Sequence, residues 1–354
     1  MRRGILSAAL VTGLLVACTS PPAAPRPSPS TAEEPARAAV ASIPPAAPTT
    51  APSATLRLGH VSPTALNWVE FVAEKRGLFA DEGLAVETTF TSAAANSAQQ
   101  LVAGELHVAT GGADAFFRAI EAGADIVLVS GQARVPPYNL VVQPTIRSYA
   151  DLRGKNVLIG GVKDPTVYFT VKMFEANGLR LDDVDLVYAG STRDRYAALV
   201  GGSVAATLIT QPFDLTAIAE GYPTLGWSGD YVQNYLFTGT AVARGWAASQ
   251  HAILVRYLRA TARASRWLEQ PANKAEAVQI LVDISKQDEP SVRATYELYF
   301  EQGKRVFYPD SRADPADVAG TLDARLALGE PRPTLPIERY LDQSYIDEAL
   351  ASLR

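Results

Sequence analysis

Strand, helix and strand follow one another in residues 56–90, which read LRLGHVSPTALNWVEFVAEKRGLFADEGLAVETTF. The first four residues form a short, mainly apolar run of the kind that predicts a strand. From Ala65 to Lys75 apolar side chains recur every three or four residues, which predicts a helix, and Gly77 follows where a helix end favours a left-handed residue. Residues 86–90 predict a second strand. This alternation indicates α/β architecture.

The same alternation continues along the chain. Further strands are predicted at 106–110, 126–129, 139–143, 157–159, 185–188, 205–209 and 238–243. Helices are predicted at 97–102, 114–122, 149–152, 166–176 and 193–200, and a long helix from the cap Ser249 to Gln270. Another helix starts at Pro271, and the rest of the chain up to Arg354 is predicted to form helices with proline breaks. Ser148 and Asp151 have the spacing of a capping box. The segments 101–106 and 199–204 both end a helix on glycine and begin a strand, which indicates either two related lobes or recurrent helix-glycine-strand punctuation.

Composition bounds the possible functions. The chain has 354 residues, of which 47% are hydrophobic and 19% charged, so about two globular units are expected. Its 32 basic against 37 acidic residues disfavour nucleic acid as a partner. One cysteine and three histidines exclude a disulfide framework and disfavour a metal site, so no metal or cofactor is expected. The P-loop, Gly-x-Ser-x-Gly and His-Glu-x-x-His motifs are absent, and no catalysis is expected.

The first 18 residues, MRRGILSAALVTGLLVAC, have two arginines and an apolar stretch too short to span a bilayer, which predicts an export signal. Its end, LVAC, resembles the lipobox of bacterial lipoproteins and implies that Cys18 is acylated. The alternative is an ordinary signal peptide with an incidental cysteine. We therefore expect an extracytoplasmic protein attached to the cell membrane by a lipid anchor.

Residues 19–54 contain ten prolines, no glycine and no aromatic residue. Such a composition cannot form a core and favours a disordered Pro/Ala-rich tether with polyproline II character. A rigid spacer across a cell wall is the alternative.

Four segments of the remaining chain resemble a known family when their order and spacing are considered together. They are VAEKRGLFADEGLAVETTF (72–90), QQLVAGELHVAT (99–110), DLRGKNVLIG (151–160) and RYAALVGGSVAATLITQPFDLTAIAEGYP (195–223). This set is similar to the nitrate/sulfonate/taurine class of ABC-importer binding proteins, also called SsuA/THI5-like or NMT1-like, over roughly residues 55–285. The family usually has aspartate in two stretches where this chain has His107 and Ala205.

The resemblance implies a type II periplasmic-binding-protein fold, with two lobes that are each a mixed sheet flanked by helices, a hinge and a C-terminal helical region. We expect lobe I to comprise residues 55–143 and 238–354, and lobe II residues 144–237. It also implies a small solute bound between the lobes and an ABC permease as partner, and we expect a monomer. The pyrimidine-forming enzymes of the family use a cysteine-rich iron motif, which this chain lacks.

Ligands of open α/β sheets bind at the carboxyl ends of strands, near helix N-termini. Turns at 60–64, 91–96, 110–114, 163–166 and 190–193 are rich in serine, threonine and glycine, which predicts an anion cradle, although each hydroxyl also suits an ordinary N-cap. Basic and aromatic side chains near these turns suit a carboxylate or sulfonate and a flat ligand. The candidate ligand-binding residues are Ser62, Thr64, Trp68, Ser92, Gly111, Gly112, Asp114, Arg134, Tyr138, Lys163, Thr166, Ser191, Arg193 and Gln211.

The function predicted from these observations is capture of a small, anionic organic solute for an ABC importer. Two alternatives remain open: a ligand-binding lipoprotein that reports to a sensor, and binding of a heterocycle such as a pyrimidine or thiamine precursor, which the donor and acceptor groups of Gln211 would suit.

Overall fold

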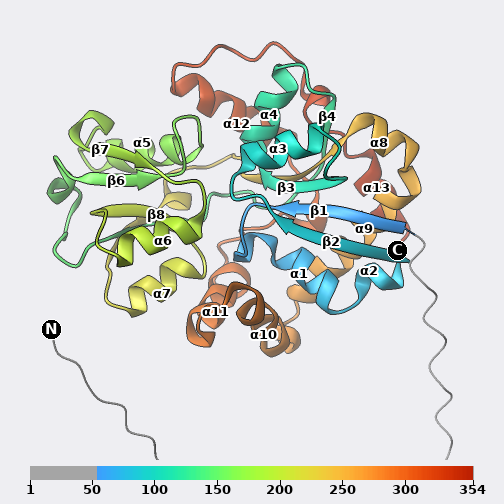
Figure 1. The fold of residues 1–354 in the computed structure, drawn as a ribbon, viewed down its shortest axis with the longest axis horizontal. Coiled ribbons are helices and arrows are strands. Elements are labelled where there is room, and N and C mark those ends of the chain that lie inside the picture. Colours follow the sequence, from blue (N-terminus) through green and yellow to red (C-terminus); the bar gives the residue numbers. More distant parts are fainter. Residues whose placement is uncertain (1–53, 354) are drawn as a thin grey trace, which may run out of the picture. The chain divides into compact units, whose positions relative to one another are not determined.

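The computed structural model describes residues 54–353, all of which fall within one unit of the chain, Thr50–Arg354. The predicted signal peptide, the acylated Cys18 and the tether lie outside the described residues, except for Ala54 at the end of the tether. Two five-stranded sheets form the framework (Figure 1). Each sheet carries helices of its own, as the alternating sequence pattern predicts.

The first sheet has the strand order β2-β1-β3-β10-β4. These strands are β1 (Ala54–His60), β2 (Leu84–Phe90), β3 (Val108–Gly112), β4 (Ile126–Gly131) and β10 (Thr238–Ala243). Strands β2, β1 and β3 are parallel, whereas β10 runs antiparallel to both β3 and β4. The second sheet has the order β7-β6-β8-β5-β9. Its strands are β5 (Tyr138–Val142), β6 (Asn156–Ile159), β7 (Asp185–Tyr188), β8 (Ala206–Thr210) and β9 (Thr224–Trp227).

The two sheets repeat one topology. In the second sheet β7, β6 and β8 are parallel and β5 is antiparallel to β8 and β9, which matches the first sheet strand for strand. The two similar segments 101–106 and 199–204 lie at equivalent places, directly before β3 and directly before β8. Their glycines Gly104 and Gly202 have φ of 73° and 70°. The antiparallel strand of each sheet is the first strand after the chain crosses from the other sheet: β5 after the crossing to the second sheet, and β10 after the return to the first.

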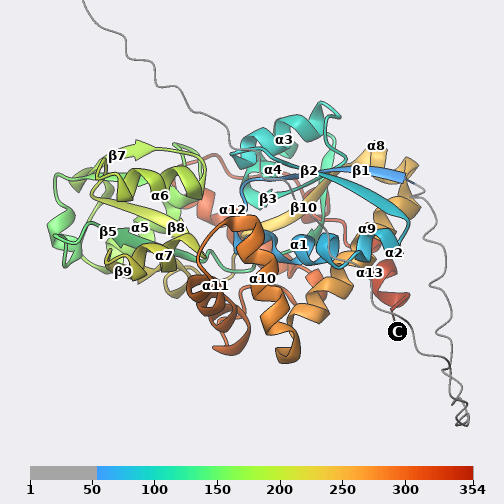
Figure 2. The same ribbon diagram turned by 60° about the horizontal axis from the view of Figure 1, so that its bottom comes forward.

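The helices follow the predicted pattern closely. They are α1 (Trp68–Lys75), α2 (Leu78–Asp81), α3 (Ala94–Val102), α4 (Ala113–Glu121), α5 (Thr166–Ala176), α6 (Thr192–Val200), α7 (Phe213–Ala219), α8 (Arg244–Ser249), α9 (His251–Leu268), α10 (Lys274–Ser285), α11 (Glu289–Tyr296), α12 (Pro315–Ala327) and α13 (Ser344–Ala351). The capping box of Ser148 and Asp151 is formed. Figure 2 shows α10 and α11 below the two sheets, and these helices belong to the C-terminal helical region that the resemblance implied.

Three expectations differ from the structure. Ser249 does not cap the long helix but ends α8, and its hydroxyl donates to the carbonyl of Trp246. The short elements α2, α7 and β9 were not predicted, because four to seven residues carry too little periodicity. Strand β5 pairs in the second sheet, so the chain leaves the first sheet before Tyr138 and not at the predicted boundary after residue 143.

The hydrophobic core is continuous where the chain crosses between the sheets. One cluster of buried side chains contains Leu58 of the first sheet and Leu140 of the second, and Tyr138, Phe169 and Phe237 contact one another within it. The crossing segments thus pack as a shared hinge region, while separate clusters of buried side chains cover the opposite face of each sheet. Within residues 54–353, no helix is both long enough and apolar enough to cross a membrane.

Candidate functional site

A cavity of about 960 Å³ lies at the carboxyl ends of strands from both sheets. Val61 and Ser62 follow β1, Gly111 and Gly112 end β3, and Thr210 ends β8. The segments after β6 and β7 add Gly160, Gly161, Lys163, Asp164, Pro165, Gly190 and Thr192. This position agrees with the general rule for ligand sites in open α/β sheets.

The loops of the two lobes also touch beside the cavity. A Cβ atom at Gly190 would lie 3.0 Å from the backbone oxygen of Ser92, closer than most Cβ contacts, so a glycine suits this close approach. The backbone amide of Ala65 donates to the carbonyl of Gln211 at 3.2 Å. The cavity is therefore bounded by direct contacts between the two lobes.

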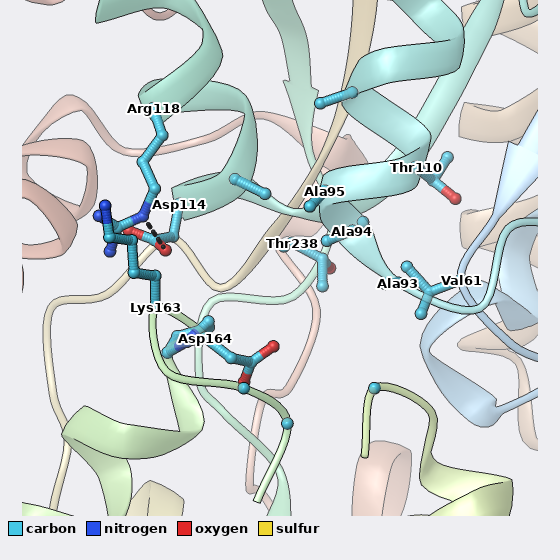
Figure 3. Close-up of a pocket in the computed structure, with 18 of the residues that line it drawn as sticks. Val61, Ala93, Ala94, Ala95, Thr110, Asp114, Arg118, Lys163, Asp164 and Thr238 are labelled. Carbon is cyan, nitrogen blue, oxygen red and sulfur yellow. Dashed lines mark hydrogen bonds and ion pairs between the residues drawn. The ribbon is translucent and has the colours of Figure 1, made fainter. Parts of the chain in front are cut away.

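Half of the sequence-predicted site residues line this cavity. They are Ser62, Thr64, Gly111, Gly112, Asp114, Tyr138 and Lys163. Figure 3 shows Asp114 on α4 and Lys163 on the loop after β6, from opposite sides of the cavity. The other seven, which are Trp68, Ser92, Arg134, Thr166, Ser191, Arg193 and Gln211, are not among the lining residues.

Several of these seven have structural roles instead. Trp68 is 0% exposed, and its indole donates to the carbonyl of Ala277 at 2.9 Å. Ser191 caps α6 by accepting from the Asp194 amide at 3.1 Å. Thr166 accepts from the Gly160 amide at 2.9 Å, which orders the loop after β6 that does line the cavity. These hydroxyls thus match the ordinary N-cap and turn alternatives more closely than direct ligand contact.

The remaining members face other directions. The guanidinium of Arg134 lies 5.7 Å from the ring centroid of Tyr308, Arg193 is exposed on α6, and Ser92 is exposed with φ of 67°. Gln211 is fully buried, donates to Asp214 and accepts from the Tyr299 hydroxyl at 2.8 Å. Gln211 therefore joins β8, α7 and the C-terminal helices, and its amide is not available to a heterocycle.

Polar residues missed by the sequence analysis line the cavity near its base. Asn67 donates to the carbonyl of Ser62 at 2.9 Å and accepts from Thr110 at 3.0 Å. The hydroxyls of Thr192 and Thr210 lie 3.0 Å apart. Thr110 and Thr192 belong to turns that the sequence analysis selected, although it chose other residues of those turns. Asn67 and Thr210 lie outside the selected turns.

His60 is not a cationic ligand. It is buried and its Nδ1 lies 2.6 Å from the Thr110 hydroxyl. Burial lowers its pKa to about 3, against a smaller opposing effect of the Asn67 hydrogen bond. The imidazole is therefore neutral near pH 7, and His60 supports Thr110 without supplying charge.

Arg195 is the central charged group that the sequence analysis missed. It lines the cavity and is only 2% exposed. Its guanidinium donates to the carbonyls of Leu208 at 2.8 Å and of Ala189 and Gly190 at 3.0 Å each. It forms no salt bridge within residues 54–353, in contrast to Arg118 on the opposite wall, which is paired with Asp114 at 3.1 Å.

A buried guanidinium without a carboxylate is costly, because carbonyl dipoles offset only part of a full charge. Its carbon lies 5.6 Å from the Tyr138 ring centroid. Burial raises the pKa of Tyr138 to about 12, with Arg195 acting in the opposite direction, so the phenol is neutral. Within the described part of the chain no carboxylate lies within salt-bridge distance of Arg195, although the Asp164 carboxylate is near enough to Tyr138 to contribute to the rise of its pKa.

The charge of the whole cavity agrees with this conclusion. The cationic lining residues are Arg118, Lys163 and Arg195, and the lining carboxylates are Asp114 and Asp164. Asp164 accepts from the amide and hydroxyl of Thr166, and burial raises the pKa of Asp114 to about 6 in spite of Arg118 and Arg325. With Asp114 and Arg118 paired, the unbalanced charge in the site is positive.

His107 and Ala205, where the family usually has aspartate, lie away from the cavity. Both precede their strands, at the amino ends of β3 and β8, and neither lines the cavity. His107 stacks on Trp246 with ring centroids 5.4 Å apart. These replacements therefore leave the lining of the cavity unchanged. Within residues 54–353, no group of His, Cys, Asp and Glu side chains is arranged to hold a metal ion.

Solved structures share this fold. The alkanesulfonate-binding protein SsuA from Xanthomonas axonopodis pv. citri, bound to MOPS, is 17% identical, covers 83% of this chain and 97% of its own, and has a TM-score of 0.65. The periplasmic nitrate-binding protein NrtA from Synechocystis PCC 6803 is 15% identical over 86% and 90%, with a TM-score of 0.71. The desulfurization enzyme DSZB is 16% identical over 85% and 99%, with a TM-score of 0.57. No curated protein matches the chain significantly.

Two helix-flanked mixed sheets of equivalent topology, with a cavity at their facing strand ends, define the two-lobed fold of periplasmic binding proteins, as predicted. Within that class, the model of the NMT1/THI5-like family matches residues 68–273, more than half of the chain. The chain belongs to the NMT1/THI5-like family.

Proposed function

We propose that this protein is the extracytoplasmic solute-binding component of an ABC importer, and that it captures a small organic anion in the cavity between its lobes. The observation that carries the proposal is Arg195, a buried cation on the cavity wall without an anionic partner in the described part of the chain. A carboxylate or sulfonate bound there would supply the missing charge and could accept a hydrogen bond from whichever of the Thr192 and Thr210 hydroxyls does not donate to the other.

Binding without chemistry is favoured over an enzymatic role. The neighbour DSZB is an enzyme, and a second structure of it is a cysteine-to-serine mutant in complex with biphenyl-2-sulfinic acid. The sole cysteine of the present chain is Cys18, in the predicted signal sequence, so the cavity has no thiol. The fold also occurs in proteins named for binding sulfonate and nitrate. We therefore assign capture, with the sensor-linked role distinguished by whether permease and ATPase genes lie beside this one.

Ligand-dependent stabilisation tests this function. Residues 54–354 would be heated in the presence of sulfonates, carboxylates, nitrate and pyrimidines, and the melting temperature recorded. For one site the gain is RT ln(1 + [L]/Kd), about 2.7 kcal/mol at a ligand concentration of 100 Kd, so a true ligand should raise the melting temperature by several degrees. Stabilisation by anions and not by pyrimidines is expected. A protein that melts at one temperature in all of them does not bind as proposed.

We also propose that Cys18 carries a lipid anchor and that residues 19–54 tether the monomeric body to the membrane. The basis is the LVAC sequence together with the Pro/Ala-rich composition that follows it. Detergent-extracted protein should have the mass of a chain beginning at an acylated Cys18, and a Cys18→Ala variant should lose the acyl mass and be released from membranes. A mature chain that begins after Cys18 would show that the signal peptide is an ordinary one.

A further inference from the structure

A network of ion pairs lies on the wall of the cavity opposite Arg195. Arg118 lines the cavity from α4, and its Nε donates to Asp114 at 3.1 Å, as the dashed line in Figure 3 marks. The same guanidinium also pairs with Glu330, which is not among the lining residues. Arg118 is therefore held by one carboxylate that lines the cavity and by one that does not.

The end of α12 places Glu330 in this network. The helix ends in a Schellman motif, in which the amide of Gly329 donates to the carbonyl of Leu326 at 2.9 Å. In the same motif the amide of Glu330 donates to the carbonyl of Arg325 at 3.2 Å. Gly329 has φ of 79°, the left-handed conformation that this motif favours. The turn thus fixes Glu330 beside the Arg325 side chain, whose Nε donates to its carboxylate at 3.2 Å.

The charges of the network do not balance. Its two guanidiniums belong to Arg118 and Arg325, and its three carboxylates belong to Asp114, Glu121 and Glu330. Burial acts to raise the pKa of Glu330, but the hydrogen bonds and charges of Arg118 and Arg325 outweigh it and hold the pKa below its ordinary value. Glu330 is therefore ionised near pH 7, and with Asp114 also ionised the network has an excess of negative charge.

A second negative charge on a ligand would find no counter-charge at this wall. Arg118 faces the cavity, but its charge is already paired, and an incoming anion would approach the carboxylates of Asp114 and Glu330. Lys163 is the third lining cation, yet it is exposed, and exposed ammonium groups contribute little to ion pairs. Like charges brought together in a site select against the ligand that carries them. The cavity therefore offers one complete anion site, at Arg195.

We infer that Glu330 is a specificity-determining residue, which neutralises Arg118 from outside the cavity and so restricts the site to ligands with a single negative charge. The selection rests on the proposed function, because Glu330 acts on the same cavity. Glu330 is a positioning residue that acts through Arg118 without touching the ligand. Removing its charge should free Arg118 to bind a second anionic group.

Calorimetric titration of residues 54–354 with paired ligands tests the inference. Succinate, glutarate, adipate and suberate would each be compared with the monomethyl ester, which has the same skeleton and one charge fewer, and alkane-α,ω-disulfonates with the monosulfonates of the same lengths. Several lengths are needed because Arg118 and Arg195 lie on opposite walls. The best-binding monoanion should bind at least about tenfold more tightly than its dianion, because the second charge meets like charges.

Two outcomes on the unaltered protein have different meanings. If a dianion binds as tightly as its matched monoanion, Arg118 or Lys163 accepts the second charge, and the inference is wrong while the proposed function stands. If no monoanion of either set binds, the proposed function itself fails.

Variants of Glu330 test its role directly. Glu330→Gln keeps the size of the side chain and should raise dianion affinity by about tenfold, because Arg118 is then free to pair with the second anionic group. Affinity for the matched monoanion, which does not reach Arg118, should stay within about twofold. Glu338→Gln, at an exposed carboxylate of the same segment, changes the net charge equally and should leave the ratio of the two affinities unaltered.

A double variant shows whether the effect passes through Arg118. Adding Arg118→Gln to Glu330→Gln should abolish the gain for dianions, because the freed guanidinium is then absent. A folded Glu330→Gln protein with an unaltered ratio, or a gain that persists without Arg118, would overturn the assignment of Glu330. If Glu330→Gln does not fold, the comparison of dianions with monoanions on the unaltered protein still decides.

Discussion

Replacing Arg195 by glutamine should reduce anion affinity at least roughly 30-fold. The expected loss is about 2–5 kcal/mol, because the variant removes the buried partner of a desolvated charge pair. Arg195 is 2% exposed, lines the cavity and has no carboxylate within salt-bridge distance in the described residues. Calorimetric titration with the best-binding sulfonate or carboxylate would measure the change in Kd.

The structural role of Arg195 has to be separated from this effect. Its guanidinium also holds the carbonyls of Leu208, Ala189 and Gly190, so the Arg195→Gln variant should melt at a lower temperature as well. Arg195→Lys keeps the charge but not the planar fork, and should bind more tightly than Arg195→Gln. Arg193→Gln, on the exposed side of the same helix, should bind as the unaltered protein does. A folded Arg195→Gln protein with unchanged Kd would exclude Arg195 as the anion ligand.

Gly320→Ala should destabilise the protein by about 3 kcal/mol or more, at the upper end of what added volume costs in a packed site. A Cβ atom at Gly320 would lie 1.8 Å from the backbone oxygen of Asn234, far inside any permitted contact. Gly320 belongs to α12, and Asn234 to the segment that returns from β9 to β10. Because the obstacle is backbone, a rotamer change cannot relieve it, and the returning segment itself must shift.

Gly245→Ala is the matched control. Gly245 also lies within a helix, α8, but nothing lies within 4 Å of its Cβ position. The substitution should stabilise by about 0.5–1 kcal/mol, because alanine has less conformational freedom to lose than glycine. Denaturant unfolding of both variants would give the two free energies. Equal effects of the two substitutions would mean that the contact between α12 and Asn234 is not formed in solution.

Much of the fold could be predicted from local pattern. Strand β10 and helix α5 have the predicted bounds, since each is a long enough run of one periodicity between clear turn residues, and the bounds of the four-residue strand β7 were predicted as well. The short elements α2, α7 and β9 were not predicted, because their few residues carry no such periodicity. Strand β5 was found, but its sheet was not, because a strand pattern does not state which strands will be its neighbours.

The candidate site could be predicted as a region but not residue by residue. Ser62 and Lys163 follow strands and Gly111 lies at the end of one, and parallel strands bring their carboxyl ends together, so the position of these residues at the cavity follows from topology. Arg193 was chosen over Arg195 although the spacing of Thr192, Arg195 and Leu199 places all three on the buried face of α6. Three- and four-residue spacing, applied to a charged residue, would have selected the arginine that lines the cavity.

The amino-acid sequence alone determined the α/β alternation, the two-lobed class and the family resemblance, because these depend on local periodicity and on short motifs that survive in the chain. The tertiary structure decided which arginine lacks a carboxylate partner, which hydroxyls cap helices and which face the cavity. These are properties of space between segments distant in sequence, and pairing, burial and empty volume arise only when such segments pack together.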